Sequence, residues 1–169
     1  MKQIQTVTGP ISAEQLGKTM MHEHCLIQQP QTYRSVDGID PSYAAFLDSK
    51  ITPQNRSKVY FHMHKHNDNL DLTDESLIIK ELQYYKQAGG DTIVDVTTPG
   101  IGRDAAALQR ISRATGVQIV ACTGLYIGDS VPEPYRSMEK AQLVNFFMDE
   151  LENGIGPERI KPGYIGEIG

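Results

Sequence analysis

Short segments rich in β-branched residues alternate with amphipathic segments along most of this chain, and this alternation constrains the fold more than any other feature. The strand-like segments are residues 4–7, 19–26, 92–98, 118–124 and 163–169. The segments between the later strands carry apolar residues at the spacing of helices. Because strands and helices in alternation build right-handed βαβ units, the sequence predicts an α/β fold with a parallel sheet.

Three helices are expected between the later strands, each with a capping residue at its start and a glycine at its end. They run from Thr73 or Asp74 to Gly89, from Asp104 to Gly116, and from Ser137 to Gly154. We expect their buried faces to consist of Leu77, Ile78, Leu82 and Tyr85 in the first helix, Leu108 and Ile111 in the second, and Leu143, Val144, Phe147, Met148 and Leu151 in the third.

The composition argues against several classes of protein. A formal net charge of −5 does not favour a broad nucleic-acid-binding surface. No apolar run approaches the roughly 20 residues that cross a bilayer, and the first residues lack the apolar core of a signal peptide. Cys25 and Cys122 are too few for a disulfide framework, so we interpret both as buried, reduced thiols. We therefore expect residues 1–169 to belong to one domain of a cytoplasmic protein that binds neither nucleic acid nor membrane.

Residues 28–72 interrupt the alternation with prolines, many polar residues and weak periodicity. This long loop insertion directly follows the first parallel strand, and segments in that position of a parallel barrel lie at the catalytic face. It is therefore expected to act as a lid or substrate loop. His62, His64 and His66 lie within it, and we interpret this run as a solvated segment, with adventitious metal binding as the alternative.

Two histidines and one acidic residue are the candidates for chemistry. Side chains alternate along a strand, so His22 and His24 point to one face and can bind one divalent ion, near the strand end where barrel active sites gather. The alternative is a pair of hydrogen-bonded, partly buried histidines. Glu167 lies between glycine and apolar residues on the last strand, where a carboxylate is costly unless it is paired or metal-bound. A structural salt bridge is the alternative for this residue.

Two further polar residues are assigned structural roles. Asp95 lies within the strand at 92–98, and we interpret it as a structural residue or as one that supports a ligand. Arg103 comes just before a helix start and could meet an anion there. We favour an ion pair between Arg103 and a surface carboxylate.

Several segments, taken together and in this order, resemble the phosphotriesterase family of the amidohydrolase superfamily. They are residues 4–11, 16–24, 92–97, 102–104, 116–126 and 160–169. The resemblance covers nearly the whole chain except the insertion. It implies a TIM, or (β/α)8, barrel of the metal-dependent hydrolase type that holds two divalent metals, usually Zn²⁺. Such barrels typically need about 250 residues, so about the first four βα units are expected in this chain.

The resemblance also implies roles for individual residues. His22 and His24 match the first-strand ligands of one metal, and Glu167 matches the carboxylate that bridges both metals. True phosphotriesterases carry a carbamylated lysine in that bridging position, so Glu167 points to the phosphotriesterase-related branch. A complete family member needs two more histidines and an aspartate from later strands. No residue of this chain is assigned as the catalytic proton acceptor.

The predicted function is that of a zinc-dependent hydrolase of the phosphotriesterase-related family, in which a metal-activated hydroxide attacks an ester, amide, lactone or phosphoester bond of a small molecule. The chain by itself is expected to be an inactive fragment, and a homo-oligomer is left open. A second hypothesis is a non-catalytic half barrel that acts as a binding or assembly module. A third, a complete flavodoxin-like domain, would need a phosphate-binding loop where residues 22–24 stand.

Overall fold

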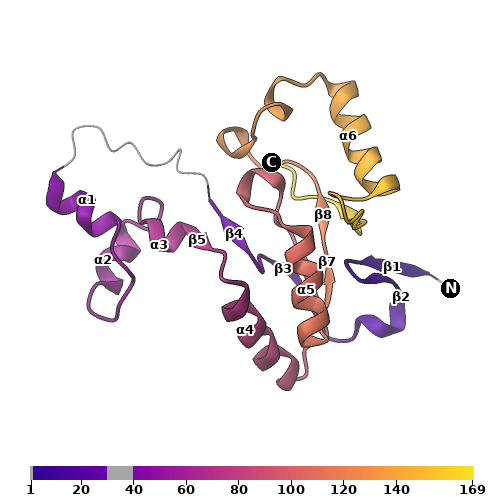
Figure 1. Ribbon diagram of the computed structural model, residues 1–169, viewed down its shortest axis with the longest axis horizontal. Coiled ribbons are helices and arrows are strands. Elements are labelled where there is room, and N and C mark those ends of the chain that lie inside the picture. The colour runs from indigo at the N-terminus through magenta and orange to yellow at the C-terminus, as the bar shows by residue number, and fades with distance from the viewer. Residues whose placement is uncertain (1, 30–39) are drawn as a thin grey trace.

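A parallel sheet covered by helices forms the centre of the computed structural model, which describes residues 2–29 and 40–169 (Figure 1). The strands are β1 (Gln3–Thr6), β2 (Gly9–Ser12), β3 (Thr19–Glu23), β4 (Ile27–Gln28), β5 (Asp71–Leu72), β6 (Thr92–Asp95), β7 (Gln118–Val120), β8 (Cys122–Thr123) and β9 (Tyr164–Ile165). The helices are α1 (Pro41–Leu47), α2 (Arg56–Phe61), α3 (Asn67–Leu70), α4 (Glu75–Gln87), α5 (Ala105–Thr115) and α6 (Lys140–Asn153).

The pairing of the strands confirms the prediction of a parallel sheet. Strands β3, β6 and β7 are hydrogen-bonded in that order, and both pairs are parallel. Strands β8 and β9 form a further parallel pair, and β8 directly follows β7 along the chain. Strands β1 and β2 form an antiparallel hairpin, and the backbone amide of Val7 at its turn donates to the carbonyl of Ile119 in β7. Because β3, β6 and β7 run in the same direction, their carboxyl ends face the same side of the molecule.

The core lies between the sheet and helices α4 and α5, which pack against each other (Figure 1). Ile93 in β6 and Ile119 in β7 are at most 1% exposed because both strands are covered. Leu108 and Ile111 of α5 are buried, as predicted. None of the helices in the described residues is both long enough and apolar enough to cross a membrane.

The sequence predicted three helices, α4, α5 and α6, and capping residues fix the starts of the first two. Asp74 caps α4 by accepting from the amides of Ser76 and Leu77, and Asp104 caps α5 by accepting from the amide of Ala107. The expected start of the third helix at Ser137 is wrong. Helix α6 begins after Glu139, whose backbone amide is bound by the Gln142 side chain in a capping box. The prediction that each of the three helices ends near a glycine is confirmed, because the backbone leaves the helix there with a positive φ, which glycine adopts readily.

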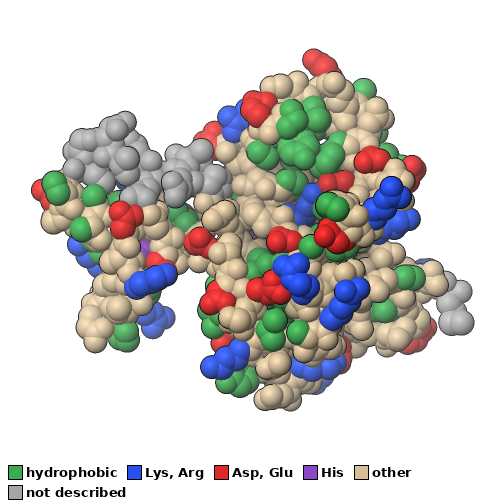
Figure 2. Space-filling model, in the orientation of Figure 1, with side chains coloured by type: hydrophobic (Ala, Val, Ile, Leu, Met, Phe, Trp, Pro, Cys, Tyr) green, Lys and Arg blue, Asp and Glu red, His purple; other side chains and the backbone are tan. Residues whose placement is uncertain are grey.

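The apolar stripe expected on α6 is only partly buried. Val144 is 49% exposed and Met148 is 43% exposed, and hydrophobic side chains gather beside this helix in Figure 2. Leu77 of α4 is also 43% exposed, although Ile78 and Leu82 on the same helix are buried. A stripe is buried only where another element covers it, and the described residues provide no such cover at these positions.

The described part of the insertion contains three short helices, α1 to α3, which the weak periodicity of its sequence did not indicate. The ring of Phe46 on α1 lies edge-on to the rings of His62 and His66, with centroid distances of 5.7 and 5.1 Å. The side chain of His66 is fully buried. The interpretation of the histidine run as solvated is therefore wrong for His66, because its ring fills the small core of the insertion. Pro30, at the start of the insertion, lies outside the described residues.

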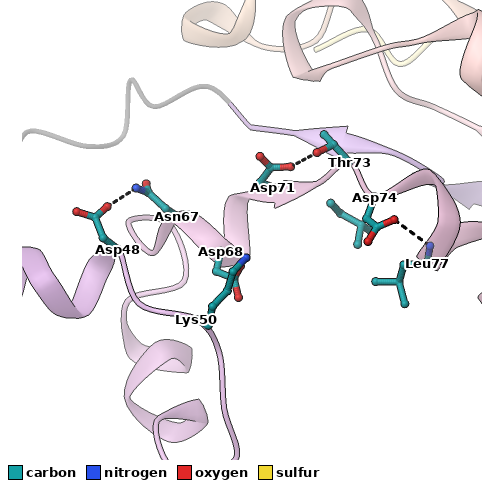
Figure 3. Close-up of a pocket in the computed structure, with 9 residues that line it drawn as sticks. Asp48, Lys50, Asn67, Asp68, Asp71, Thr73, Asp74 and Leu77 are labelled. Atoms are coloured by element: carbon teal, nitrogen blue, oxygen red, sulfur yellow. Dashed lines mark hydrogen bonds and ion pairs between the residues drawn. The ribbon is translucent and has the colours of Figure 1, made fainter.

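Local polar contacts hold together the described part of the insertion and the start of α4, which follows it. A cavity of about 510 Å³ lies between its helices and the start of α4, and four aspartates line it (Figure 3). Asp68 pairs with Lys50, Asp71 accepts from the hydroxyl of Thr73, and Asp74 caps α4. These acidic groups therefore hold neighbouring segments together, and we assign them a structural role.

Burial of His66 makes the stability of the protein depend on pH. Burial lowers the pKa of His66, so the unfolded chain binds a proton more readily than the folded chain. Stability is therefore expected to fall as the pH drops below about 6.5, the ordinary value for histidine, towards the lowered folded value. Thermal unfolding between pH 7.5 and pH 5 checks this. His66→Gln should weaken the pH dependence, whereas His64→Gln, at an exposed position, should leave it unchanged.

Candidate metal centre

The structure brings together the three side chains that the sequence singles out. His22 comes from the end of β3, His24 follows that strand directly, and Glu167 follows β9. One nitrogen from each ring and one carboxylate oxygen all lie within 4.8 Å of one another. The Nε2 atom of His22 is 3.8 Å from Oε1 of Glu167. Residues separated by most of the chain therefore meet at the carboxyl end of the parallel strands.

The two histidine rings meet at right angles at the end of β3. Their centroids are 6.0 Å apart and their planes differ by 88°. The pairing of β3 with β6 shifts register between Met20 and Glu23, and His24 already lies beyond the strand. Both rings nevertheless line the same cavity, as the alternation of side chains predicts. The side chain of His22 is 63% exposed, so it has room to rotate, whereas His24 is held by a hydrogen bond to Thr97.

A cavity of about 160 Å³ lies in front of these side chains. Besides the three candidate ligands, its walls are formed by Ile27, Gln29, Ile101, Tyr126 and Ser130. No lysine or arginine lines it among the described residues. The sequence did not identify these wall residues, since Ile27 lies in the two-residue strand β4 and the others lie in loops or short turns, all without a periodic pattern. Their only signal is position, because each follows a strand of the parallel sheet at its carboxyl end.

Asp95 connects the ends of the strands beneath the candidate ligands. Its buried carboxylate accepts from the backbone amides of Cys25 at 2.7 Å and Thr97 at 3.0 Å. Burial raises the pKa of Asp95, and the two amide donors oppose that effect by stabilising the charged form. The hydroxyl of Tyr164 in β9 donates to the backbone carbonyl of Asp95 at 3.0 Å. Asp95 thus has the structural role that we expected, and it joins β3, β6 and β9 below the site.

Arg103 pairs with a carboxylate, but the partner is buried and the expectation of a surface pair is wrong. The two terminal guanidinium nitrogens of Arg103, Nη1 and Nη2, donate to the carboxylate of Glu150 on α6, and the side chains are only 6% and 9% exposed. The same guanidinium donates to the backbone carbonyl of Cys122 at 3.1 Å. This fork joins the segment before α5, the start of β8 and the last turns of α6.

Comparison with known proteins identifies relatives along nearly the whole chain. Residues 2–169 match the family model described as "Phosphotriesterase family". The chain is 35% identical over 167 residues to a human protein named N-acetyltaurine hydrolase. It is 36% identical over 171 residues to a phosphotriesterase-related protein of Nematostella vectensis. Each match covers 98% of this chain and 47% of the relative, so the chain spans about half the length of these relatives.

Solved structures give the same result for the fold. A resiniferatoxin-binding protein from Rhodobacter sphaeroides superposes with a TM-score of 0.87 at 32% sequence identity. A mutant organophosphorus hydrolase from Deinococcus radiodurans superposes with a TM-score of 0.65 at 26% identity. Both matches cover 98% of this chain, but only 46% and 43% of those proteins. The prediction of a partial barrel of parallel βα units is confirmed.

Proposed function

This chain belongs to the phosphotriesterase family, and we propose that it contributes His22, His24 and Glu167 to the two-metal centre of a zinc-dependent hydrolase. The observation that carries the proposal is the convergence of two imidazoles and one carboxylate, within 4.8 Å of one another, at the mouth of the parallel strands. Active sites of barrel enzymes lie at that end of the strands. Because the chain spans about half of its relatives, the remaining ligands are expected from the part of the family fold that it does not cover.

The donor set fits a divalent ion such as Zn²⁺. Zinc binds imidazole nitrogen at about 2.0–2.1 Å, so two ligands of one ion lie no more than about 4 Å apart. The observed separations of up to 4.8 Å exceed that limit slightly. A small rotation of the exposed His22 side chain would close the gap, and Glu167 is near enough to share an ion with it.

Bound divalent metals would supply a water of lowered pKa and would polarise the bond under attack. The residues of this chain hold and orient that centre: Asp95 and Tyr164 fix the strand ends, and Thr97 fixes the ring of His24. The small cavity and its mixture of apolar and neutral polar walls suit a small-molecule substrate. We further propose a cytoplasmic location and no role in binding nucleic acid.

The bond that is broken can be an ester, an amide, a lactone or a phosphoester, since such a centre can act on all four. An amide of an N-acylated small molecule is the first to test, because relatives 33–36% identical to this chain are named N-acetyltaurine hydrolases. Glu167 in place of the carbamylated lysine of true phosphotriesterases makes phosphoesters the last of the four.

A non-catalytic binding or assembly module is the second candidate. The exposed apolar side chains of Ile165 in β9 and of Val144 and Met148 in α6 favour it, because they need a covering element. Metal analysis combined with a hydrolysis assay separates the two candidates, since a binding module needs neither a metal nor a substrate.

Metal analysis of the protein made from its complete reading frame tests the proposed function. We expect about two divalent ions per barrel. Hydrolysis of N-acyl, ester and lactone test substrates should be lost after chelation of the metal and should recover when Zn²⁺ is added. A metal-free protein with full hydrolase activity would overturn the metal centre. A metal-free protein without hydrolase activity would instead support the binding module.

A further inference from the structure

The ring of His24 is held by a hydrogen bond whose direction follows from its surroundings. Its Nδ1 atom lies 3.0 Å from the hydroxyl oxygen of Thr97. The same hydroxyl lies 3.1 Å from the backbone carbonyl oxygen of Leu26, which only accepts hydrogen bonds. The Thr97 hydroxyl therefore uses its one proton towards Leu26. Its oxygen is left to accept a hydrogen bond that the N–H group at Nδ1 of His24 donates.

The position of that proton decides which nitrogen of His24 can bind a metal. A neutral imidazole carries one N–H group, and the hydrogen bond made by one ring nitrogen selects which nitrogen is protonated. With the proton on Nδ1, the lone pair of Nε2 is free for a ligand.

Thr97 is itself fixed from several sides. It is 2% exposed, and its backbone amide donates to the Asp95 carboxylate at 3.0 Å. Its backbone carbonyl accepts from the thiol of Cys122 at 3.4 Å. Burial and these backbone hydrogen bonds thus hold Thr97 in place just after β6, where its hydroxyl meets His24.

We propose that Thr97 is a positioning residue that holds His24 in the Nδ1–H tautomer and keeps Nε2 available to a divalent metal. The inference rests on the proposed function, in which His24 is a metal ligand. It explains why a threonine, and not an apolar residue, stands at this buried position: partners that orient a ligating histidine typically account for about 10- to 100-fold in metal affinity. A valine there would fill nearly the same volume without the hydroxyl.

Zinc affinity of the protein made from its complete reading frame, measured by competition with a chromophoric chelator, tests the inference. Thr97→Val is expected to weaken zinc binding by about 10- to 100-fold. Thr97→Ser, which keeps the hydroxyl, should retain most of the affinity. Thr123→Val is the matched control: it is the same change at a fully buried threonine whose hydroxyl has no hydrogen-bond partner among the described residues. It should bind zinc as the unmodified protein does.

A second measurement follows the tautomer directly. Nitrogen-15 NMR of the metal-free protein at pH 8 is expected to show His24 protonated on Nδ1, and this signature should be lost in Thr97→Val and kept in Thr97→Ser. A purely structural role of Thr97 would lower the melting temperature without moving the ring protonation or the zinc affinity.

The outcomes separate this inference from the proposed function. Unchanged zinc affinity in Thr97→Val, or an equal loss in Thr97→Ser, would overturn the role of the hydroxyl while leaving the metal centre in place. If the unmodified protein does not bind zinc, or binds it equally well after His22→Ala and His24→Ala, the metal centre is wrong and the role of Thr97 is overturned with it.

Discussion

Replacing His22 and His24 together with alanine is expected to lower kcat/KM by at least about 10³-fold, because a metal centre lowers the pKa of a bound water from 15.7 to about 7 and that gain is lost with its ligands. The metal content of the variant should fall in parallel. Nε2 of His22 lies 3.8 Å from Oε1 of Glu167, and a ring nitrogen of His24 lies within 4.8 Å of both residues' ligand atoms. Glu167→Gln is therefore expected to lower metal content and kcat/KM as well. Steady-state kinetics and metal analysis on the protein from the complete reading frame measure both effects.

His64→Ala is the control for this prediction. His64 is an exposed histidine in the insertion, outside the cavity that His22 and His24 line, and its loss should change neither metal content nor kcat/KM. A double variant at His22 and His24 that kept its metal and its activity would contradict the proposed centre. Loss of activity with full retention of metal would contradict the role of these residues as ligands.

The largest expected effect on stability comes from Arg103→Met. The guanidinium is one half of a buried pair, and its removal leaves the carboxylate of Glu150 buried without a cation. Breaking a buried pair in this way typically costs about 3–5 kcal/mol of unfolding free energy. Urea unfolding measures the change. A double variant, Arg103→Met with Glu150→Leu, is expected to recover much of the loss, since no unpaired charge stays behind.

An exposed pair of the same residue types provides the comparison. Arg110 on α5 forms a salt bridge with Glu75 on α4, and the two side chains are 56% and 31% exposed. Arg110→Met should have a much smaller effect on stability, because water already solvates both charges. If Arg103→Met cost no more than Arg110→Met, the buried fork would not be the main connection between α5, β8 and α6.

Contacts between residues close in sequence account for the predictions that hold. A cap at Asp74 or Asp104 depends on amides two or three residues ahead, and the turn at Gly116 depends on its own φ. The strands at β6 and β7 follow from short runs that contain β-branched residues, whose strand propensity is a local property. Helix caps, glycine turns and strand propensity all depend on residues close in sequence, so they can be predicted from the sequence alone.

Failures of sequence reasoning arise where a side chain depends on a distant partner. Arg103 looked like a surface residue because Glu150, its partner, lies on another helix. His66 was interpreted as solvated because its neighbours in sequence are polar. The ring of Phe46, which packs against it, lies 20 residues earlier in the chain, so the local sequence does not indicate this contact. Val144 and Met148 looked buried because a stripe indicates an apolar face without showing what covers it.

The sequence by itself determined the alternation of strands and helices, the parallel sheet, and the choice of His22, His24 and Glu167 as the side chains worth testing. Only the tertiary structure decided that these three meet within 4.8 Å, that Thr97 lies under His24, and that Asp95 joins the strand ends below them. The reason is physical: periodicity and capping depend on neighbours along the chain, whereas a site depends on distances that are fixed only when the strands pair and the helices pack over them.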